Sequence, residues 1–168
     1  PHSRHTCAHG LMQQYSSLDT PCLLASWVAV GVFDGVHRGH QALLSHLAAR
    51  AHAAGLPAAV VTFHPHPAVA LGKVQPPFYL TSPQQRAEQL ARLGIDALIT
   101  LPFNASLAQV EAEAFMRQLI RTLGLRRLVV GEGFALGRGR QGDIPTLQKL
   151  GKSLGYSVEV VQPQQSTD

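Results

Sequence analysis

The chain is poor in the residues that mark several classes of protein. Its 168 residues include two cysteines, Cys7 and Cys22, too few for a disulfide framework, so a reducing, cytoplasmic setting is expected. No apolar run reaches the roughly 20 residues of a membrane-spanning helix, and the chain does not open with a signal-peptide layout. Aromatic residues make up 6%, and none interleave with a basic run. We therefore expect neither a nucleic-acid nor a membrane partner.

The rest of the composition is typical of one globular domain with anionic partners. Hydrophobic residues make up 45% of the chain and charged residues 14%, with a formal net charge of +4. Residues 1–10 have no hydrophobic period, and we predict a tail or N-terminal extension over 1–22 before a single domain over 23–168. The histidines and the cysteine of the first ten residues match no familiar zinc spacing, so no metal site is predicted there.

Apolar segments of two kinds alternate along the predicted domain. Short apolar runs predict strands over 27–32, 58–63, 95–101, 127–130 and 156–161. Apolar residues at helical spacing predict helices over 40–54, 106–123 and 145–154, and a further helix that begins with Ser82 and Pro83 and stops at Gly94. This order predicts an α/β fold with a mainly parallel, five-stranded sheet and helices on both faces.

Three loops of this predicted fold are candidates for a ligand site. Ligands of parallel α/β sheets bind beyond the carboxyl ends of the strands, and this rule brings residues 33–40, 64–77 and 131–142 to one crevice. The second loop is long for a compact domain, which indicates a functional role.

The first of these loops has the features of a phosphate site. His37 and His40 lie three apart, after an apolar strand and in the predicted first turn of a helix, so both rings face one side. Helix N-terminal N–H groups and imidazoles donate hydrogen bonds to phosphate oxygens, and Gly39 permits close approach. The alternative is a pair of ordinary surface histidines. His46 and His52, further along the helix, are expected to be solvated.

Residues 31–40, Gly-Val-Phe-Asp-Gly-Val-His-Arg-Gly-His, resemble the nucleotidyltransferase signature of the prokaryotic FAD synthetases. These are bifunctional riboflavin kinase/FMN adenylyltransferases, and the resemblance is to their N-terminal adenylyltransferase module. Further similar motifs follow in the same order: Thr62-Phe-His-Pro-His-Pro67, Leu80-Thr-Ser82 followed by Arg86, Val129-Val-Gly131 to Phe134, and Gly137-Arg-Gly-Arg140 with Gly142-Asp143. The resemblance spans most of residues 27–162 and implies a Rossmann-like nucleotidyltransferase fold.

What the resemblance implies is adenylyl transfer, in which ATP and FMN give FAD and pyrophosphate with Mg²⁺. His37 and His40 would be the catalytic residues, binding ATP phosphates and stabilising the transition state, while Phe33 and Asp34 would help to seat the nucleotide. The other ligand-binding residues are expected to be Gly39, Thr62, His64, Pro65, Pro67, Gly131, Gly133, Phe134, Arg138 and Arg140. Residues 62–67 would line the flavin side, with Phe63 itself in the core.

The two arginines of this set have a chemical reason of their own. Guanidinium forks pair well with phosphate oxygens, so Arg138 and Arg140 are expected to close over phosphates. The alternative for these two residues is an ordinary solvated basic loop.

The chain also departs from the pattern of this family. Gly133 stands where the family usually carries Asn or Asp, and the following run reads Phe134-Ala-Leu-Gly137 in place of Phe-x-Phe-Gly. The family's Ser-Ser-Thr-x-x-Arg segment and its kinase module have no counterpart within the 168 residues, so no riboflavin kinase activity is expected of them. Two alternatives stay open: a nucleotidyltransferase with another phosphorylated acceptor, and a degenerate, non-catalytic nucleotide- or flavin-binding domain.

Overall fold

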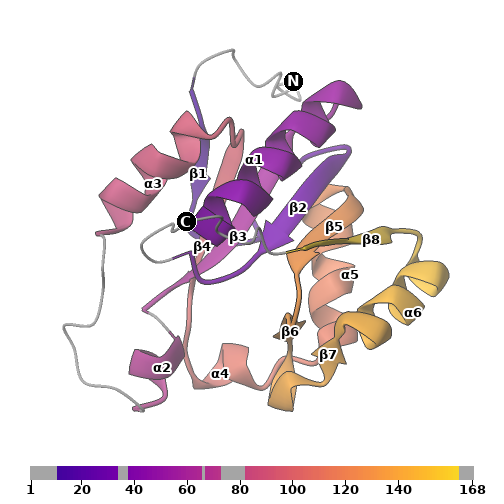
Figure 1. Ribbon diagram of the computed structural model, residues 1–168. Helices are drawn as coiled ribbons and strands as arrows, with labels where there is room; N and C mark the ends of the chain where they lie inside the picture. Colours follow the sequence, from indigo (N-terminus) through magenta and orange to yellow (C-terminus); the bar gives the residue numbers. More distant parts are fainter. Residues whose placement is uncertain (1–10, 34–37, 66, 73–81, 163–168) are drawn as a thin grey trace.

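The computed structural model describes residues 11–33, 38–65, 67–72 and 82–162, and it has an α/β architecture (Figure 1). All neighbouring strands of its six-stranded sheet run parallel, in the order β1-β4-β3-β2-β5-β8. These strands are β1 (Gln13–Tyr15), β2 (Ser26–Val30), β3 (Ala58–His64), β4 (Ala97–Pro102), β5 (Leu125–Gly131) and β8 (Ser157–Val161). The predicted fold class is confirmed, whereas the predicted count of five strands is wrong by one because β1 adds an edge strand.

Helices cover both faces of the sheet, as predicted. The residues of α1 (Arg38–Ala53) and α3 (Pro83–Arg92) pack into one apolar cluster, and those of α5 (Ala112–Leu123) and α6 (Ile144–Leu154) pack into the other. The shorter elements are α2 (Pro67–Ala70), α4 (Ala105–Ala108), the antiparallel pair β6 (Ala135–Leu136) and β7 (Gly142–Asp143), and a 3₁₀ turn, η1, over Arg138–Arg140. Among the described residues, no helix has both the length and the apolarity to cross a membrane.

The central strand β2 shows why a continuous apolar run forms a strand here. All five of its residues are buried, because helices cover both faces of the sheet at this position. Its side chains alternate between the two clusters, with Val28 and Val30 in the α5/α6 cluster and Trp27 and Ala29 in the α1/α3 cluster. The strand therefore joins both cores and fixes where the loop after it begins.

The helix ends follow local rules that the sequence displays. The Ser82 side chain accepts a hydrogen bond from the Gln85 backbone N–H, while the Gln85 side chain accepts one from the Ser82 N–H, so α3 begins with a capping box. Asp143 caps α6 by accepting a hydrogen bond from Thr146, which lowers the pKa of its carboxyl group. The predicted start of α3 at Ser82 and its stop before Gly94 are confirmed.

Several predicted element boundaries are wrong. The helix expected over 106–123 is divided into α4 and α5, because the Val110 carbonyl between them accepts a hydrogen bond from the Arg138 N–H instead of continuing a helix. The long loop expected after His64 contains α2. The strand β1, which pairs with β4, lies within residues 1–22; the division into an N-terminal extension over 1–22 and a domain over 23–168 stays a prediction.

Candidate active site

The candidate site lies at the end of the central strand β2, from which the chain adds strands first on one side and then on the other. From β2 the chain passes through α1 and α3 to β3 and β4 on one side, and then returns through α5 to β5 on the other side of β2. The strands that precede the three candidate loops, β3, β2 and β5, are therefore adjacent and parallel (Figure 1). The expectation that these loops begin at one edge of the sheet is confirmed, and this edge is where such folds bind ligands.

His40 lies in the first turn of α1, against the end of β2. Its ring contacts the ring of Phe33 edge to face, with the centroids 5.1 Å apart and an interplanar angle of 88°. Phe33 is buried, and its ring lies so close to the backbone that a Cβ on Gly31 would come within 2.8 Å of it. The buried Phe33 thus restricts where the His40 ring can lie. His37 and Asp34 lie outside the described residues, so the predicted pair of histidines stays a prediction.

The first turn of α1 also lies near the end of β5. Gly39 is exposed in this turn. At the end of β5, a Cβ on Gly131 would lie 3.6 Å from the Cδ1 atom of Leu43, which is on the next turn of α1. This contact brings the start of the glycine-rich loop beside the N-terminal half of the helix that carries His40.

The end of β3 contributes the second group of predicted residues. Thr62 is fully buried, while His64, Pro65 and Pro67 are half-buried where the strand ends and α2 begins. Phe63 points to the other face, where its ring contacts Phe103 edge to face at 5.7 Å. Phe63 thus packs on the α5/α6 core, as expected for it.

The glycine-rich loop after β5 is fastened to the start of α5. A Cβ on Gly137 would lie 2.8 Å from the Ala112 backbone nitrogen, and the Arg138 N–H donates to the Val110 carbonyl at 2.9 Å. Phe134 is half-buried against the α5/α6 core, whereas Gly133 is exposed with a φ of +76°.

The two predicted arginines lie on the exposed part of this loop. Arg138 and Arg140 are both exposed, and Nη2 of Arg140 donates a hydrogen bond to the Gly133 carbonyl at 3.1 Å. Arg140 adopts a positive φ of 55°, which is uncommon for a residue with a side chain. Its side chain is thus turned back across the loop, next to Gly133.

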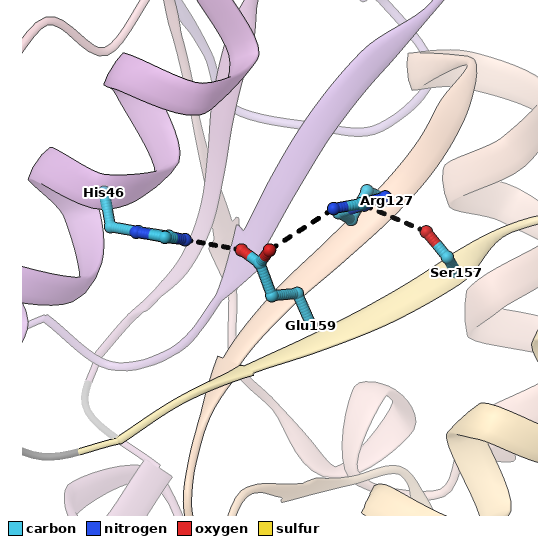
Figure 2. A network of polar contacts seen from close by, with 4 residues as sticks. All are labelled: His46, Arg127, Ser157 and Glu159. Carbon is cyan, nitrogen blue, oxygen red and sulfur yellow. Dashed lines mark hydrogen bonds and ion pairs between the residues drawn. The ribbon is translucent and has the colours of Figure 1, made fainter.

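A polar network that no sequence pattern indicates joins α1 to β8 (Figure 2). Nε2 of His46 lies 2.5 Å from Oε2 of Glu159, whose other carboxylate oxygen lies 3.3 Å from Nη1 of Arg127. Arg127 also donates from Nε to the Ser157 hydroxyl at 3.0 Å and stacks over the Trp27 ring at 4.5 Å. The expectation that His46 is merely solvated is therefore wrong.

His52 also has a carboxylate partner. It is 47% exposed, yet its Nε2 lies 2.7 Å from Oδ2 of Asp96, which also accepts a hydrogen bond from the Ala58 N–H. The contact joins the last turn of α1 to the beginning of β3 and to the residue before β4.

One buried, positively charged residue near the candidate site is not among the ligand-binding or catalytic residues predicted from the sequence. Arg86 is only 2% exposed, and its Nη1 lies 3.5 Å from the Thr62 hydroxyl and 3.4 Å from the Phe63 carbonyl oxygen. The sequence shows Arg86 as part of a motif but carries no signal that its guanidinium group is buried at the end of β3.

Two further kinds of feature could mark a site in the described residues, a groove and a cluster of metal-binding side chains. A groove of about 740 Å³ between β1, α3 and β4 is lined by none of the predicted site residues. Within the described ranges, no group of three or more His, Cys, Asp or Glu side chains is placed to hold a metal ion.

Comparisons with known proteins agree with this architecture. A family model described as FAD synthetase matches residues 20–168. The bifunctional riboflavin kinase/FMN adenylyltransferase of Escherichia coli K12 is 35% identical over 136 residues, which is 80% of this chain and 44% of that protein. The protein of the same name from Pseudomonas fluorescens is 40% identical over 134 residues, or 79% of this chain and 43% of that one. This chain thus spans less than half the length of these curated relatives.

A solved structure shares the fold. The crystal structure described as a macrolide-efflux protein from Streptococcus pneumoniae superposes with a TM-score of 0.79 and 26% sequence identity. The match covers 93% of this chain and 51% of that chain.

Proposed function

Because the chain belongs to the FAD synthetase family, we propose that it is an FMN adenylyltransferase, which transfers AMP from ATP to FMN. The observation that carries the proposal is the position of His40. This residue lies in the first turn of α1, directly beyond the central strand β2, from which the chain builds the sheet outward on both sides. A helix N-terminus at this edge offers backbone N–H groups and a partial positive charge to a phosphate. The site therefore suits a reaction between two phosphate groups.

The reaction needs no covalent enzyme intermediate. A phosphate oxygen of FMN attacks the α-phosphorus of ATP, and the bond between that phosphorus and the bridging oxygen of the β-phosphate breaks. FAD forms, and pyrophosphate leaves with the electron pair of the broken bond. Catalysis then depends on aligning the two phosphates and stabilising the negative charge that spreads in the transition state. His37 and His40 donate hydrogen bonds to these oxygens, and Gly39 lets the phosphates approach the backbone.

The acceptor side is formed by the loops after β3 and β5. Residues His64, Pro65 and Pro67 contact the flavin, while the fully buried Thr62 lies behind them in β3. From the other side, Gly131, Gly133 and Phe134 bound the same space, and Arg138 and Arg140 pair with phosphate oxygens. Support for this arrangement comes from strands β3, β2 and β5. They are adjacent and parallel, so the three loops that follow them begin at the same end of the sheet.

Magnesium enters this scheme with the nucleotide. Mg²⁺ keeps several waters and binds mainly through substrate phosphates in such enzymes, and the described residues offer no cluster of acidic or histidine side chains to hold it. We therefore assign no protein ligand to the ion and no step to it. A cytoplasmic location, expected from the low cysteine content, is part of the same proposal.

A second candidate function changes only the acceptor. Gly133 is exposed, has no side chain to contact a flavin, and stands where the family usually carries Asn or Asp. This observation favours an adenylyltransferase that uses another phosphorylated small molecule.

Product analysis separates the two candidates. The protein is mixed with ATP and Mg²⁺ and with FMN or a panel of other phosphorylated acceptors, and FAD and pyrophosphate are quantified. FAD appearing with FMN at the rate of pyrophosphate release supports the proposal. Pyrophosphate that forms only with another acceptor supports the second candidate instead.

A further inference from the structure

Among the described side chains that are no more than about 2% exposed, that of Arg86 is the largest. A guanidinium group stays charged at every physiological pH, and burying it without partners is costly. It is also carried by a rigid element, because α3 begins with the Ser82–Gln85 capping box and buries the neighbouring Ala87 and Leu90. The position of this charge is therefore fixed by the fold.

The Arg86 guanidinium lies where β2 and β3 separate. Backbone carbonyls alternate sides along a strand. The Val61 carbonyl accepts a hydrogen bond from the Gly31 N–H at 3.0 Å, and the His64 carbonyl accepts one from Phe103 on the β4 side. The Phe63 carbonyl consequently faces the side of β2, but β2 has already ended at Val30.

Arg86 supplies the donor that β2 no longer offers at this position. Its Nη1 lies 3.4 Å from the Phe63 carbonyl oxygen and 3.5 Å from the hydroxyl oxygen of Thr62, which is fully buried. One guanidinium nitrogen thus contacts two consecutive residues at the end of β3. The next residue is His64, at which the loop toward α2 begins.

We propose that Arg86 is a positioning residue for substrate binding, which acts by holding the end of β3 and so orients His64, Pro65 and Pro67. This inference rests on the proposed function, in which these residues line the flavin. Lysine cannot replace Arg86 in this role, because its side chain is shorter and its ammonium nitrogen does not reach the position of Nη1. Loss of the guanidinium should therefore weaken binding of FMN more than binding of ATP.

The test compares four proteins with the parent. Arg86→Lys keeps the charge, Thr62→Val removes only the hydroxyl acceptor, and the double variant combines the two. Arg92→Met is the matched control, because Arg92 is an exposed arginine on the same helix. The dissociation constant of FMN is measured by flavin fluorescence and that of ATP by calorimetry. The KM for FMN, kcat and the melting temperature are measured in parallel.

The expected result is a selective loss of FMN affinity. Arg86→Lys should raise the dissociation constant and KM of FMN about tenfold, and Thr62→Val about threefold, with the ATP constant within twofold of the parent. In the double variant Thr62→Val should add less than twofold, because the two residues act together. Arg92→Met should match the parent.

Other results overturn the inference. FMN affinity within twofold of the parent in a folded Arg86→Lys, fully additive effects, or an equal loss for FMN and ATP would each show that Arg86 only stabilises the fold. If Arg86→Lys does not fold, unchanged FMN affinity in Thr62→Val has the same meaning. A parent that binds FMN but makes no FAD refutes the proposed function and leaves the affinity test of Arg86 in force, whereas a parent that does not bind FMN refutes both.

Discussion

Replacement of Gly133 by asparagine should tighten flavin binding. Gly133 has a φ of +76°, in the left-handed region, and nothing lies within 4 Å of a Cβ built on it. The substitution therefore causes no clash, and asparagine tolerates this conformation better than most residues, so we expect a loss of at most about 1 kcal/mol of folding free energy. One new hydrogen bond to FMN would contribute about 0.5–1.5 kcal/mol, which lowers the dissociation constant by about two- to twelvefold.

The control for this prediction is Gly133→Ala. Alanine also places a Cβ at this positive φ, at a somewhat larger backbone cost than asparagine, but it adds no polar group, so its FMN affinity should stay within about twofold of the parent. Flavin fluorescence titration measures both variants, and urea unfolding measures their stability. If asparagine and alanine give the same FMN affinity, or if asparagine weakens binding, then position 133 does not face the flavin and the arrangement proposed for this loop is refuted.

Three further predictions concern other parts of the chain. His40→Ala should lower kcat about 100-fold or more while changing the ATP dissociation constant only a few-fold, and a kcat within threefold of the parent would contradict the proposed catalytic role. Burial raises the pKa of Tyr156 to about 12, and its hydroxyl donates to the Leu147 carbonyl at 2.8 Å. Since an unfolded tyrosine ionises near pH 10, the stability due to the neutral form should be lost as the pH rises from about 10 to 12. In Tyr156→Phe, urea unfolding should show a shallower decline over that range, and equal slopes would count against this reasoning. Glu159→Gln removes the negative charge at the centre of the α1–β8 network and replaces one of its two acceptor oxygens by a donor, which should cost about 1 kcal/mol, whereas Glu113→Gln, at an exposed pair, should cost less than about 0.5 kcal/mol. Equal costs would mean that the network does not stabilise the fold.

The elements predicted correctly are those whose signals are local. Strand β2 could be predicted because its buried run is apolar throughout, and the start of α3 because Ser82, Pro83 and Gln85 carry its capping pattern. Strand β1 could not be predicted, because its three residues have no apolar alternation and form a strand only by pairing with β4. The division between α4 and α5 likewise depends on a distant residue, Arg138.

For the candidate site too, some features follow from local sequence signals and others depend on contacts between separate segments. Its place at the carboxyl ends of β2, β3 and β5 follows from the order of the elements and a general rule of parallel sheets. The contacts that orient its residues do not follow from the order of the elements. The edge-to-face packing of Phe33 on His40 and the donor that Arg86 offers to β3 each depend on how separate segments pack in space, and composition and spacing do not show this packing.

An FMN adenylyltransferase moves an adenylyl group from ATP to FMN. Incubation with FMN, Mg²⁺ and ATP labelled either at the α-phosphorus or at the γ-phosphorus tests this most directly. If the protein is an FMN adenylyltransferase, the α-label appears in FAD and the γ-label in pyrophosphate, in equal amounts. Label that remains in ATP, or a γ-label released as inorganic phosphate without any FAD, would contradict it.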